Sequence, residues 1–228
     1  MKRAFILIFA AIMILSFCSC VQGGAQEDSS FESGEEFVAN KTIVARNGYL
    51  GVQFSVPSGW YVHRIDYTNL SEKYETTAKI ENLDVFEDEG YFAIQLLDIA
   101  NLANETDERH VRLIMFAEKY ETEVTIEEYM DAFQAWFVEG KDESAKVVEY
   151  SLIARDKVTM GGIAYEHVML NVDGVYENDE LIEEFFAIKR KDYYLMVAMQ
   201  YWPDGKKSRD DVVEKIKESL VYAENINA

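Results

Sequence analysis

The residues of this chain that could do acid–base or metal chemistry are its three histidines and its many carboxylates. His63, His110 and His167 lie far apart in the sequence, and none has a partner at the spacing of a metal-binding motif. Each is therefore predicted to be a surface or core-edge histidine rather than a catalyst, unless the fold brings the three together.

Two acidic clusters are the other candidates for chemistry. Residues 87–90 read EDEG and residues 177–180 read ENDE. Hard cations such as calcium bind carboxylate oxygens, but neither cluster follows the spacing of a calcium loop. Both are predicted to be solvated loops, and the sequence predicts neither a metal site nor a cofactor.

Sequence motifs of the common enzyme classes are missing. There is no G-x-S-x-G elbow, H-E-x-x-H pair, Walker loop or G-x-G-x-x-G turn. Paired carboxylates can serve a glycosidase, but the chain is small for one and has no evident sugar-binding loops. We therefore predict no catalytic residue and no enzymatic activity. The alternative is a small secreted hydrolase that uses surface carboxylates.

Net charge argues against one class of partner. The chain has 42 acidic and 22 basic side chains, which gives a formal net charge of −20. Such a surface repels nucleic-acid phosphates, so no nucleic-acid partner is expected. The acidity is typical of a protein that must remain dissolved outside the cell. Attraction of a basic partner or of cations is the alternative.

The first twenty residues predict where the protein goes. Lys2 and Arg3 precede an apolar stretch at residues 4–15, and Ser19 and Cys20 follow it. This is the layout of a secretory signal. It resembles a prokaryotic lipoprotein signal, in which a small residue precedes the cysteine that is lipidated.

That resemblance implies a signal peptide at residues 1–19 and lipidation at Cys20. It also implies a location on the extracytoplasmic side of the cell membrane, through an N-terminal lipid anchor. Phe17 stands where such signals usually have Leu, Val or Ile, and Cys18 is the alternative modified residue. Cys18 and Cys20 are the only two cysteines, so the exported domain is predicted to have no disulfide.

The remainder of the chain divides into two parts. Residues 20–41 are rich in Gly, Ser and Glu and predict a flexible acidic tether. Residues 42–228 have the length and apolar content of a single domain.

Alternating apolar residues predict that this domain is built largely from strands. Residues 49–56 alternate Leu50, Val52, Phe54 and Val56 with polar or small residues, and the Asn47-Gly48 pair predicts a hairpin with residues 42–46. Trp60 follows this strand and is expected to be buried. Further strands are predicted at residues 91–99, 111–118, 147–155, 163–172, 181–189 and 193–202, with turns at residues 161–162 and 190–192.

Two helices are predicted from local sequence patterns. Thr125 and Glu128 form a capping box, and apolar residues recur at helical spacing behind it. A last helix is predicted to start near Ser208, with Val212, Val213, Ile216 and Leu220 on its apolar face. A third, shorter helix near residues 67–74 has a weaker pattern.

The hairpin at residues 181–202 carries aromatic side chains on both of its faces. We predict that helices cover both faces, and an exposed aromatic surface is the alternative. The aromatic residues are Phe185, Phe186, Tyr193, Tyr194, Tyr201 and Trp202.

Consecutive hairpins with helices between and after them predict an α+β fold, in which helices sandwich an antiparallel β-sheet. The segment 54–60, which reads FSVPSGW, is similar to the opening of PsbP-like domains, and the long hairpin followed by a terminal helix is similar to their close. The resemblance spans roughly residues 42–222 and implies a central antiparallel sheet between helical layers. Its motifs are structural, so it implies no functional site.

Together these observations predict a membrane-anchored extracytoplasmic lipoprotein that acts as a non-enzymatic binding or accessory module. Its ligand is unknown, and a protein partner of unknown identity is expected.

Overall fold

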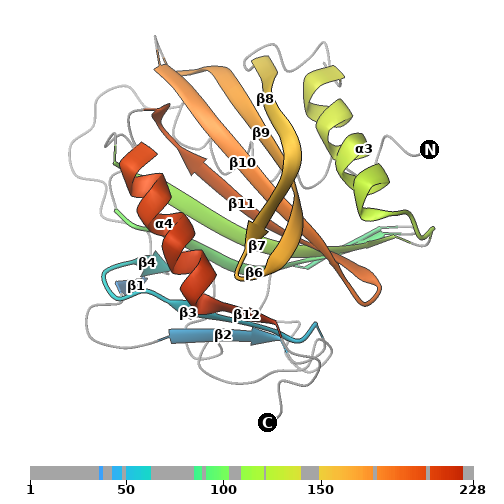
Figure 1. Cartoon of the computed structure of the whole chain (residues 1–228), viewed down its shortest axis with the longest axis horizontal. Helices are drawn as coiled ribbons and strands as arrows, with labels where there is room; N and C mark the ends of the chain where they lie inside the picture. Colours follow the sequence, from blue (N-terminus) through green and yellow to red (C-terminus); the bar gives the residue numbers. More distant parts are fainter. Residues whose placement is uncertain are drawn as a thin grey trace.

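The computed structural model describes residues 36–37, 43–47, 50–62, 85–88, 91–102, 109–120, 122–139, 149–176, 179–203 and 206–222 (Figure 1). Within these ranges the chain forms a nine-stranded antiparallel sheet, a three-stranded antiparallel sheet and two helices. The strands are β1 (Glu36–Phe37), β2 (Ile43–Asn47), β3 (Val52–Val56), β4 (Tyr61–Val62), β5 (Val85–Asp88), β6 (Tyr91–Ala100), β7 (Val111–Tyr120), β8 (Glu149–Met160), β9 (Ile163–Tyr176), β10 (Asp179–Arg190), β11 (Tyr193–Tyr201) and β12 (Leu220–Tyr222). The helices are α3 (Ile126–Glu139) and α4 (Lys206–Ser219).

The large sheet has the strand order β1-β4-β6-β7-β11-β10-β9-β8, with β5 paired to β6. Its long strands confirm the six runs predicted from alternation, and most of them extend a few residues further. Two tight turns set the register of two of its hairpins. Gly161 and Gly162, both at positive φ, join β8 to β9, and Lys191 at φ 55° lies in the turn between β10 and β11.

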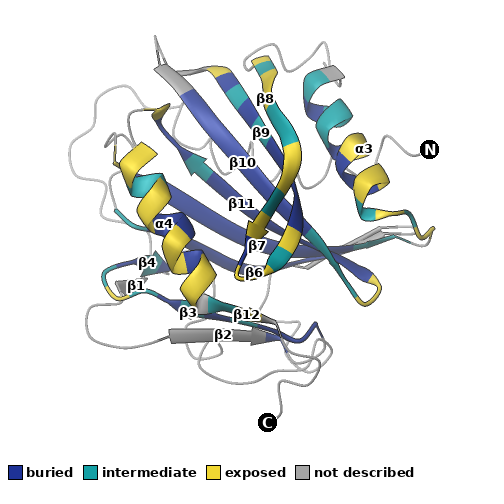
Figure 2. Ribbon diagram, in the orientation of Figure 1, coloured by how far each residue is buried: buried dark blue, intermediate teal, exposed yellow. Residues whose placement is uncertain are grey.

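Alternation along β11 divides the interior into two cores. Leu195, Val197 and Met199 belong to a core on one face of the large sheet, whereas Tyr194 and Met196 belong to a core on the opposite face. Successive strand residues point to opposite faces, and both sets are buried, so both faces are covered along this strand. Figure 2 shows the central strands as almost entirely buried.

Helix α3 covers one face of the sheet, which we call the α3 face. Its start is the predicted capping box: the Thr125 backbone N–H donates to Glu128 Oε2 over 2.8 Å, and the Glu128 N–H donates to Thr125 Oγ1 over 3.1 Å. Met130, Phe133 and Phe137 are buried against the aromatic and aliphatic side chains of β7, β9, β10 and β11.

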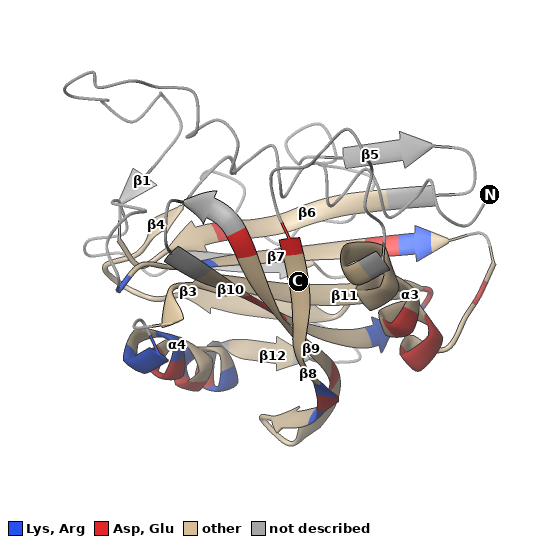
Figure 3. Ribbon diagram, turned by 90° about the horizontal axis from the view of Figure 1, so that it is seen from above, with Lys and Arg blue, Asp and Glu red and all other residues tan. Residues whose placement is uncertain are grey.

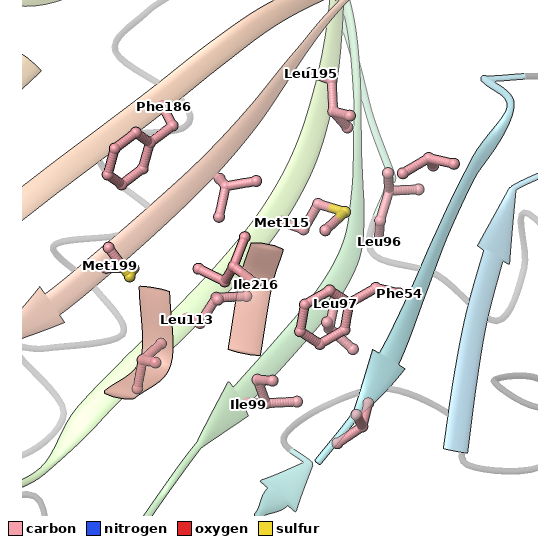
Figure 4. Close-up of a cluster of buried hydrophobic side chains, with 14 of the residues drawn as sticks. Phe54, Leu96, Leu97, Ile99, Leu113, Met115, Phe186, Leu195, Met199 and Ile216 are labelled. Atoms are coloured by element: carbon pink, nitrogen blue, oxygen red, sulfur yellow. The ribbon is translucent and has the colours of Figure 1, made fainter. Parts of the chain in front are cut away.

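Helix α4 and the three-stranded sheet cover the other face, which we call the α4 face (Figure 1). Val212, Val213 and Ile216 of α4 pack against the sheet as predicted. Figure 4 shows Ile216 of α4 and Phe54 of the small sheet among the side chains of this core. The fold is therefore an α+β fold of mostly antiparallel sheet, with one helix on one face and a helix plus a second small sheet on the other.

The C-terminal helix ends earlier than its apolar pattern predicted. Leu220 was expected on the helix, but α4 ends at Ser219, and Leu220 is the first residue of β12, opposite Phe54 of β3. The side chain still packs against the same core. Apolar periodicity marked the buried side correctly but could not show that the backbone changes from helix to strand there.

The first predicted hairpin is present but lies in the small sheet, whose order is β12-β3-β2. Its second strand begins at Val52 rather than at residue 49, because Gly51 has a φ of +63° and forms part of the turn. The Asn47 side chain closes that turn by accepting a hydrogen bond from the Leu50 N–H over 3.0 Å. Trp60 is 3% exposed, which confirms its predicted burial.

Several predictions concern residues outside the described ranges. These are the signal peptide, Cys20, most of the tether, His63 and the short helix near residues 67–74. Within the predicted tether, Glu36 and Phe37 are described and form β1, which pairs with β4, so the prediction of a flexible segment is wrong at these two residues. Among the described helices, none has the length and apolar character that a membrane crossing requires.

Candidate functional site

Several titratable side chains meet in a largely buried polar network on the α4 face, whose outer member, Asp156, is exposed. His167 of β9 lies at its centre. The ring nitrogen Nδ1 lies 2.6 Å from Asp156 Oδ1 of β8, and Nε2 lies 3.0 Å from Glu184 Oε1 of β10. The ring also stacks on Phe186, with 4.8 Å between centroids.

Hairpin register explains why these groups meet. A two-residue turn at Gly161-Gly162 places Asp156 directly opposite His167, and β10 pairs with β9 so that Phe186 is opposite His167. Glu184 lies two residues from Phe186 on the same face, within reach of the ring.

Glu184 joins this network to helix α4 and to β11. Arg209 of α4 donates from Nε to Glu184 Oε2 over 2.8 Å and from a second nitrogen to Glu184 Oε1. The Tyr201 hydroxyl donates to Glu184 Oε2 over 3.2 Å. The Glu184 carboxylate is fully buried, and its partners are the His167 ring, the Arg209 guanidinium and the Tyr201 hydroxyl.

The electrostatics favour the charged forms of both central groups. Burial by itself would lower the pKa of His167, but hydrogen bonds to Glu184 and Asp156 outweigh it, and the pKa is raised. Burial by itself would raise the pKa of Glu184, but His167 and Arg209 outweigh it, and that pKa is lowered. A protonated imidazole that donates to two carboxylates is consistent with both shifts.

A second ionic cluster lies on the α3 face of the same hairpin, one residue along each strand. Glu166 of β9 accepts from Arg155 over 2.6 Å and from Lys157 over 2.7 Å, both on β8. The same two cations reach helix α3, where Lys157 lies 2.8 Å from Glu127 and Arg155 lies 3.1 Å from Asp131. Figure 3 shows this alternation of charge along β8 and the acidic residues of α3. This cluster ties α3 to the sheet from the outside.

Glu183 is the third titratable feature, and it has a different environment. It is 2% exposed, and its Oε2 atom has no hydrogen-bond partner among the described residues. Burial alone raises the pKa of Glu183 to about 8. A carboxyl group with that pKa is mostly protonated at neutral pH.

Glu118 of β7 is another buried acid, and tyrosine hydroxyls supply hydrogen bonds to its carboxylate. Its Oε2 accepts hydrogen bonds from the hydroxyls of Tyr120 and Tyr129, over 3.0 and 2.9 Å. Tyr129 stacks on Tyr194, and the Tyr194 hydroxyl donates to the Val124 carbonyl over 2.7 Å. These rings fix the start of α3 on the sheet.

The predicted aromatic hairpin is covered on both faces. All six of its aromatic side chains are at most 9% exposed. Helix α3 covers one face, and α4 with the small sheet covers the other, so the alternative of an exposed aromatic surface on this hairpin is wrong.

The candidate residues from the sequence are spread over the molecule. His167 lies in the network just described, and His110 lies in a separate place before β7, buried at 6% exposure. His63 and the side chains of residues 87–90 and 177–180 lie outside the described part of the chain. The backbone nevertheless places Glu87 and Asp88 in β5 and Asp179 and Glu180 in β10, so the prediction of loops is wrong at these four residues. Within the described residues, no group of three His, Cys, Asp or Glu side chains is arranged to hold a metal ion.

The partners of His167 were not predicted from the sequence, although turn geometry could have indicated one of them. Once Gly161-Gly162 is taken as a two-residue turn, counting outward pairs Lys157 with Glu166 and Asp156 with His167. Arg209 could not have been found in this way, because its contact with Glu184 depends on how α4 packs on the sheet.

Comparisons with known proteins add little to this description. No family model and no curated protein matches the chain. Among solved structures, the chain is similar to LpqN, involved in cell envelope biogenesis of Mycobacterium tuberculosis, at 10% identity over 75% of this chain and 82% of that one, with a TM-score of 0.38. It is also similar to the PsbP of the cyanobacterium Synechocystis sp. PCC 6803, at 11% identity over 89% and 99%, with a TM-score of 0.43.

PsbP is the family that the sequence resembles. TM-scores below 0.5 do not by themselves establish a common fold, so the layered α+β description rests on the strands and helices of this chain.

Proposed function

We propose that this protein is a lipid-anchored extracytoplasmic accessory module that binds another molecule rather than transforming it. Support for the anchor comes from the sequence, in which an apolar stretch ends at Ser19-Cys20. Support for binding rather than catalysis comes from the described fold, in which His167 and Glu183, the groups best suited to acid–base chemistry, are buried.

The observation that carries this proposal is the environment of His167. Both of its ring nitrogens are taken by carboxylates, one face of the ring is stacked on Phe186, and the residue is 4% exposed. A general base must reach the proton that it abstracts, within hydrogen-bond distance or through one water. His167 instead serves to join three strands and, through Glu184, helix α4.

The hydrolase alternative finds its best candidate in Glu183, whose raised pKa would suit a general acid. That side chain is 2% exposed on the α3 face, so a substrate has no access to it in this structure. Binding is therefore the function that the described geometry favours.

The anchor is tested by labelling cells with a palmitate analogue. Label is expected in the wild-type chain and not in Cys20→Ala, because Cys20 supplies the only predicted acylated thiol of the mature chain. Equal labelling of wild type and Cys20→Ala would contradict the assignment and move the site to Cys18.

The binding role is tested by chemical cross-linking in intact membranes followed by purification of the chain in detergent. A discrete cross-linked species should form with the wild type and decline with Cys20→Ala, which is not held at the membrane. If no species forms at any cross-linker length, the proposed binding function is wrong.

A further inference from the structure

Three tyrosines and one buried glutamate form a compact cluster where β7 and β11 meet the start of helix α3. Glu118 is 2% exposed, and its Oε2 atom accepts hydrogen bonds from the hydroxyls of Tyr129 and Tyr120, over 2.9 and 3.0 Å. The Tyr129 ring stacks almost parallel on Tyr194, with 4.4 Å between centroids and 6° between planes. This tyrosine cluster lies on the α3 face, opposite the network around His167.

The hydrogen bonds of the cluster suit the chemistry by which a tyrosine loses an electron. A tyrosine hydroxyl has an ordinary pKa of about 10 and is protonated at neutral pH. Burial and the Glu118 carboxylate raise the pKa of Tyr120 further. A phenol that loses an electron becomes a strong acid, so the electron leaves easily only where a base can take the proton. Glu118 is a base at hydrogen-bond distance from two hydroxyls.

Tyr194 has a different role in the cluster. Its hydroxyl donates to the Val124 carbonyl over 2.7 Å, and a carbonyl oxygen is not a base that can hold the proton. The Lys189 ammonium lies 5.8 Å from the centroid of the Tyr194 ring, where it opposes positive charge on that ring. Tyr194 is therefore the stacking partner of the oxidised ring. Of the two donors to Glu118, Tyr129 has the shorter hydrogen bond and the stacked neighbour.

The burial of Tyr129 is compatible with this chemistry. An electron moves over several ångströms through protein, so the oxidised ring need not touch its oxidant, whereas an acid–base catalyst must reach its substrate. Tyr129 is 3% exposed, but the half-buried Tyr120 ring lies edge-on to it, with 6.1 Å between centroids. One short step through Tyr120 thus brings an electron to the surface, and enclosure keeps solvent away from the radical that remains.

We propose that Glu118 and Tyr129 form a one-electron oxidation site, which takes an oxidising equivalent from a diffusible one-electron oxidant such as a high-valent metal complex or an inorganic radical. The Tyr129 O–H bond breaks, its electron passes to the oxidant, and its proton forms a new O–H bond on Glu118 Oε2. The products are a neutral tyrosyl radical, a protonated Glu118 and the oxidant reduced by one electron. This activity is additional to the proposed binding function and does not depend on it.

The test uses the full-length protein in detergent, with hexachloroiridate(IV) as the oxidant. Stopped-flow absorbance follows the loss of the oxidant, and samples frozen during the reaction are measured by electron paramagnetic resonance. The wild type should give a tyrosyl signal and a fast phase that is slower in D₂O, because the proton moves with the electron. Tyr129→Phe keeps the stacked ring without the hydroxyl, so both the signal and the fast phase should be lost.

Two further variants separate this chemistry from a structural role. Glu118→Gln keeps an acceptor oxygen but removes the base, so the fast phase should slow about a hundredfold and lose its dependence on D₂O. The matched control is Tyr201→Phe, since Tyr201 is also buried and donates to a carboxylate, that of Glu184, over 3.2 Å. His167 and Arg209 lower the pKa of Glu184 against the effect of burial, which makes it a poor proton acceptor. Tyr201→Phe should therefore match the wild type.

Four results would overturn the inference: a tyrosyl signal that persists in Tyr129→Phe, a wild-type signal that belongs to tryptophan, equal rates in D₂O and H₂O, or equal losses in Tyr129→Phe and Tyr201→Phe. Melting temperatures identify any variant that is not folded. If Glu118→Gln does not fold, the comparison of Tyr129→Phe with Tyr201→Phe and the wild-type isotope effect decide the question by themselves.

Discussion

Two consecutive glutamates of β10 lie on opposite faces of the large sheet, so the environments of the two faces can be compared directly. Glu183 faces α3 and Glu184 faces α4, and both are almost fully buried, at 2% and 0% exposure. Glu184 has His167, Arg209 and Tyr201 as partners, and its pKa is lowered. Glu183 has an unpartnered oxygen among the described residues, and its pKa is raised to about 8.

Burial therefore does not decide the charge of a carboxyl group by itself. The same desolvation acts on both glutamates, and the presence of cations on one face reverses its result. The two residues should consequently affect stability in opposite directions as pH changes. Glu184 contributes stability above an ordinary carboxyl pKa of about 4.5, whereas Glu183 costs stability there.

The largest effect is expected from Glu184→Gln. The substitution keeps the shape of the side chain but removes the buried charge that His167 and Arg209 share, and leaves them only the exposed carboxylates of Asp156 and Asp210. Breaking a buried ion pair in this way costs about 3–5 kcal/mol. Urea denaturation at pH 6 measures the loss.

The matched control for Glu184→Gln is Glu166→Gln on the α3 face, where the Lys157 side chain is 59% exposed and can turn to solvent. Its loss should be clearly smaller. Equal losses would show that the two ionic clusters are equivalent and that the comparison of faces is wrong.

Glu183→Gln should give the opposite sign. Between the ordinary carboxyl pKa of about 4.5 and the folded pKa of about 8, the unfolded chain is ionised and the folded chain is not. Folding stability of the wild type then falls by about 1.4 kcal/mol for each pH unit across that window. The variant should lose this slope, so it should be more stable than wild type at pH 7.5 and equal to it near pH 4.

The raised pKa of Glu183 would be contradicted if the free energies of unfolding of wild type and Glu183→Gln differed by the same amount at every pH. That result would mean that the carboxylate is ionised and has a partner that the described residues do not supply.

His167→Gln should change stability on the alkaline side. The folded pKa of His167 is raised above its ordinary value of 6.5. Its contribution is therefore fully present below pH 6.5 and is lost as pH rises through the folded value. Ionisation of Glu183 also lowers stability over part of this pH range. His167→Gln should therefore be compared with the wild-type histidine in a Glu183→Gln background. There the decrease of folding stability with rising pH that is due to His167 should vanish.

Titration of the His167 ring protons by NMR gives an independent check of this prediction. A midpoint at or below 6.5 would be incompatible with an imidazolium held between Asp156 and Glu184.

The smallest effect is expected from Lys157→Met. Its pair with Glu127 joins two groups that are each about half exposed, and such pairs contribute little. Glu166, its other partner, keeps its ion pair with Arg155 after the substitution. The loss should shrink further as salt is added, since exposed charges are screened. A loss above that of Glu166→Gln would show that the α3 cluster is held mainly by its outer pair.

The sequence predicted the elements of this fold better than their assembly. Alternation located the long strands, and Thr125 and Glu128 located the start of α3, because both signals are local. The separate small sheet was not predicted, since pairing of Leu220 with Phe54 joins residues from opposite ends of the domain. The same distinction between local signals and assembly applies to the candidate site. Turn geometry could have paired Asp156 with His167, but the contact between Arg209 and Glu184 depends on three-dimensional packing.

The direct passage from α4 into β12 has a consequence for when the domain can form. Strand β3 lies near the start of the domain, and its partner β12 is made of residues 220–222, so some 165 residues separate the pair. During synthesis, β3 has only β2 as a partner in the small sheet until almost the entire domain has been made. The small sheet is therefore completed late, and the side of β3 that pairs with β12 stays unpaired by that strand until then.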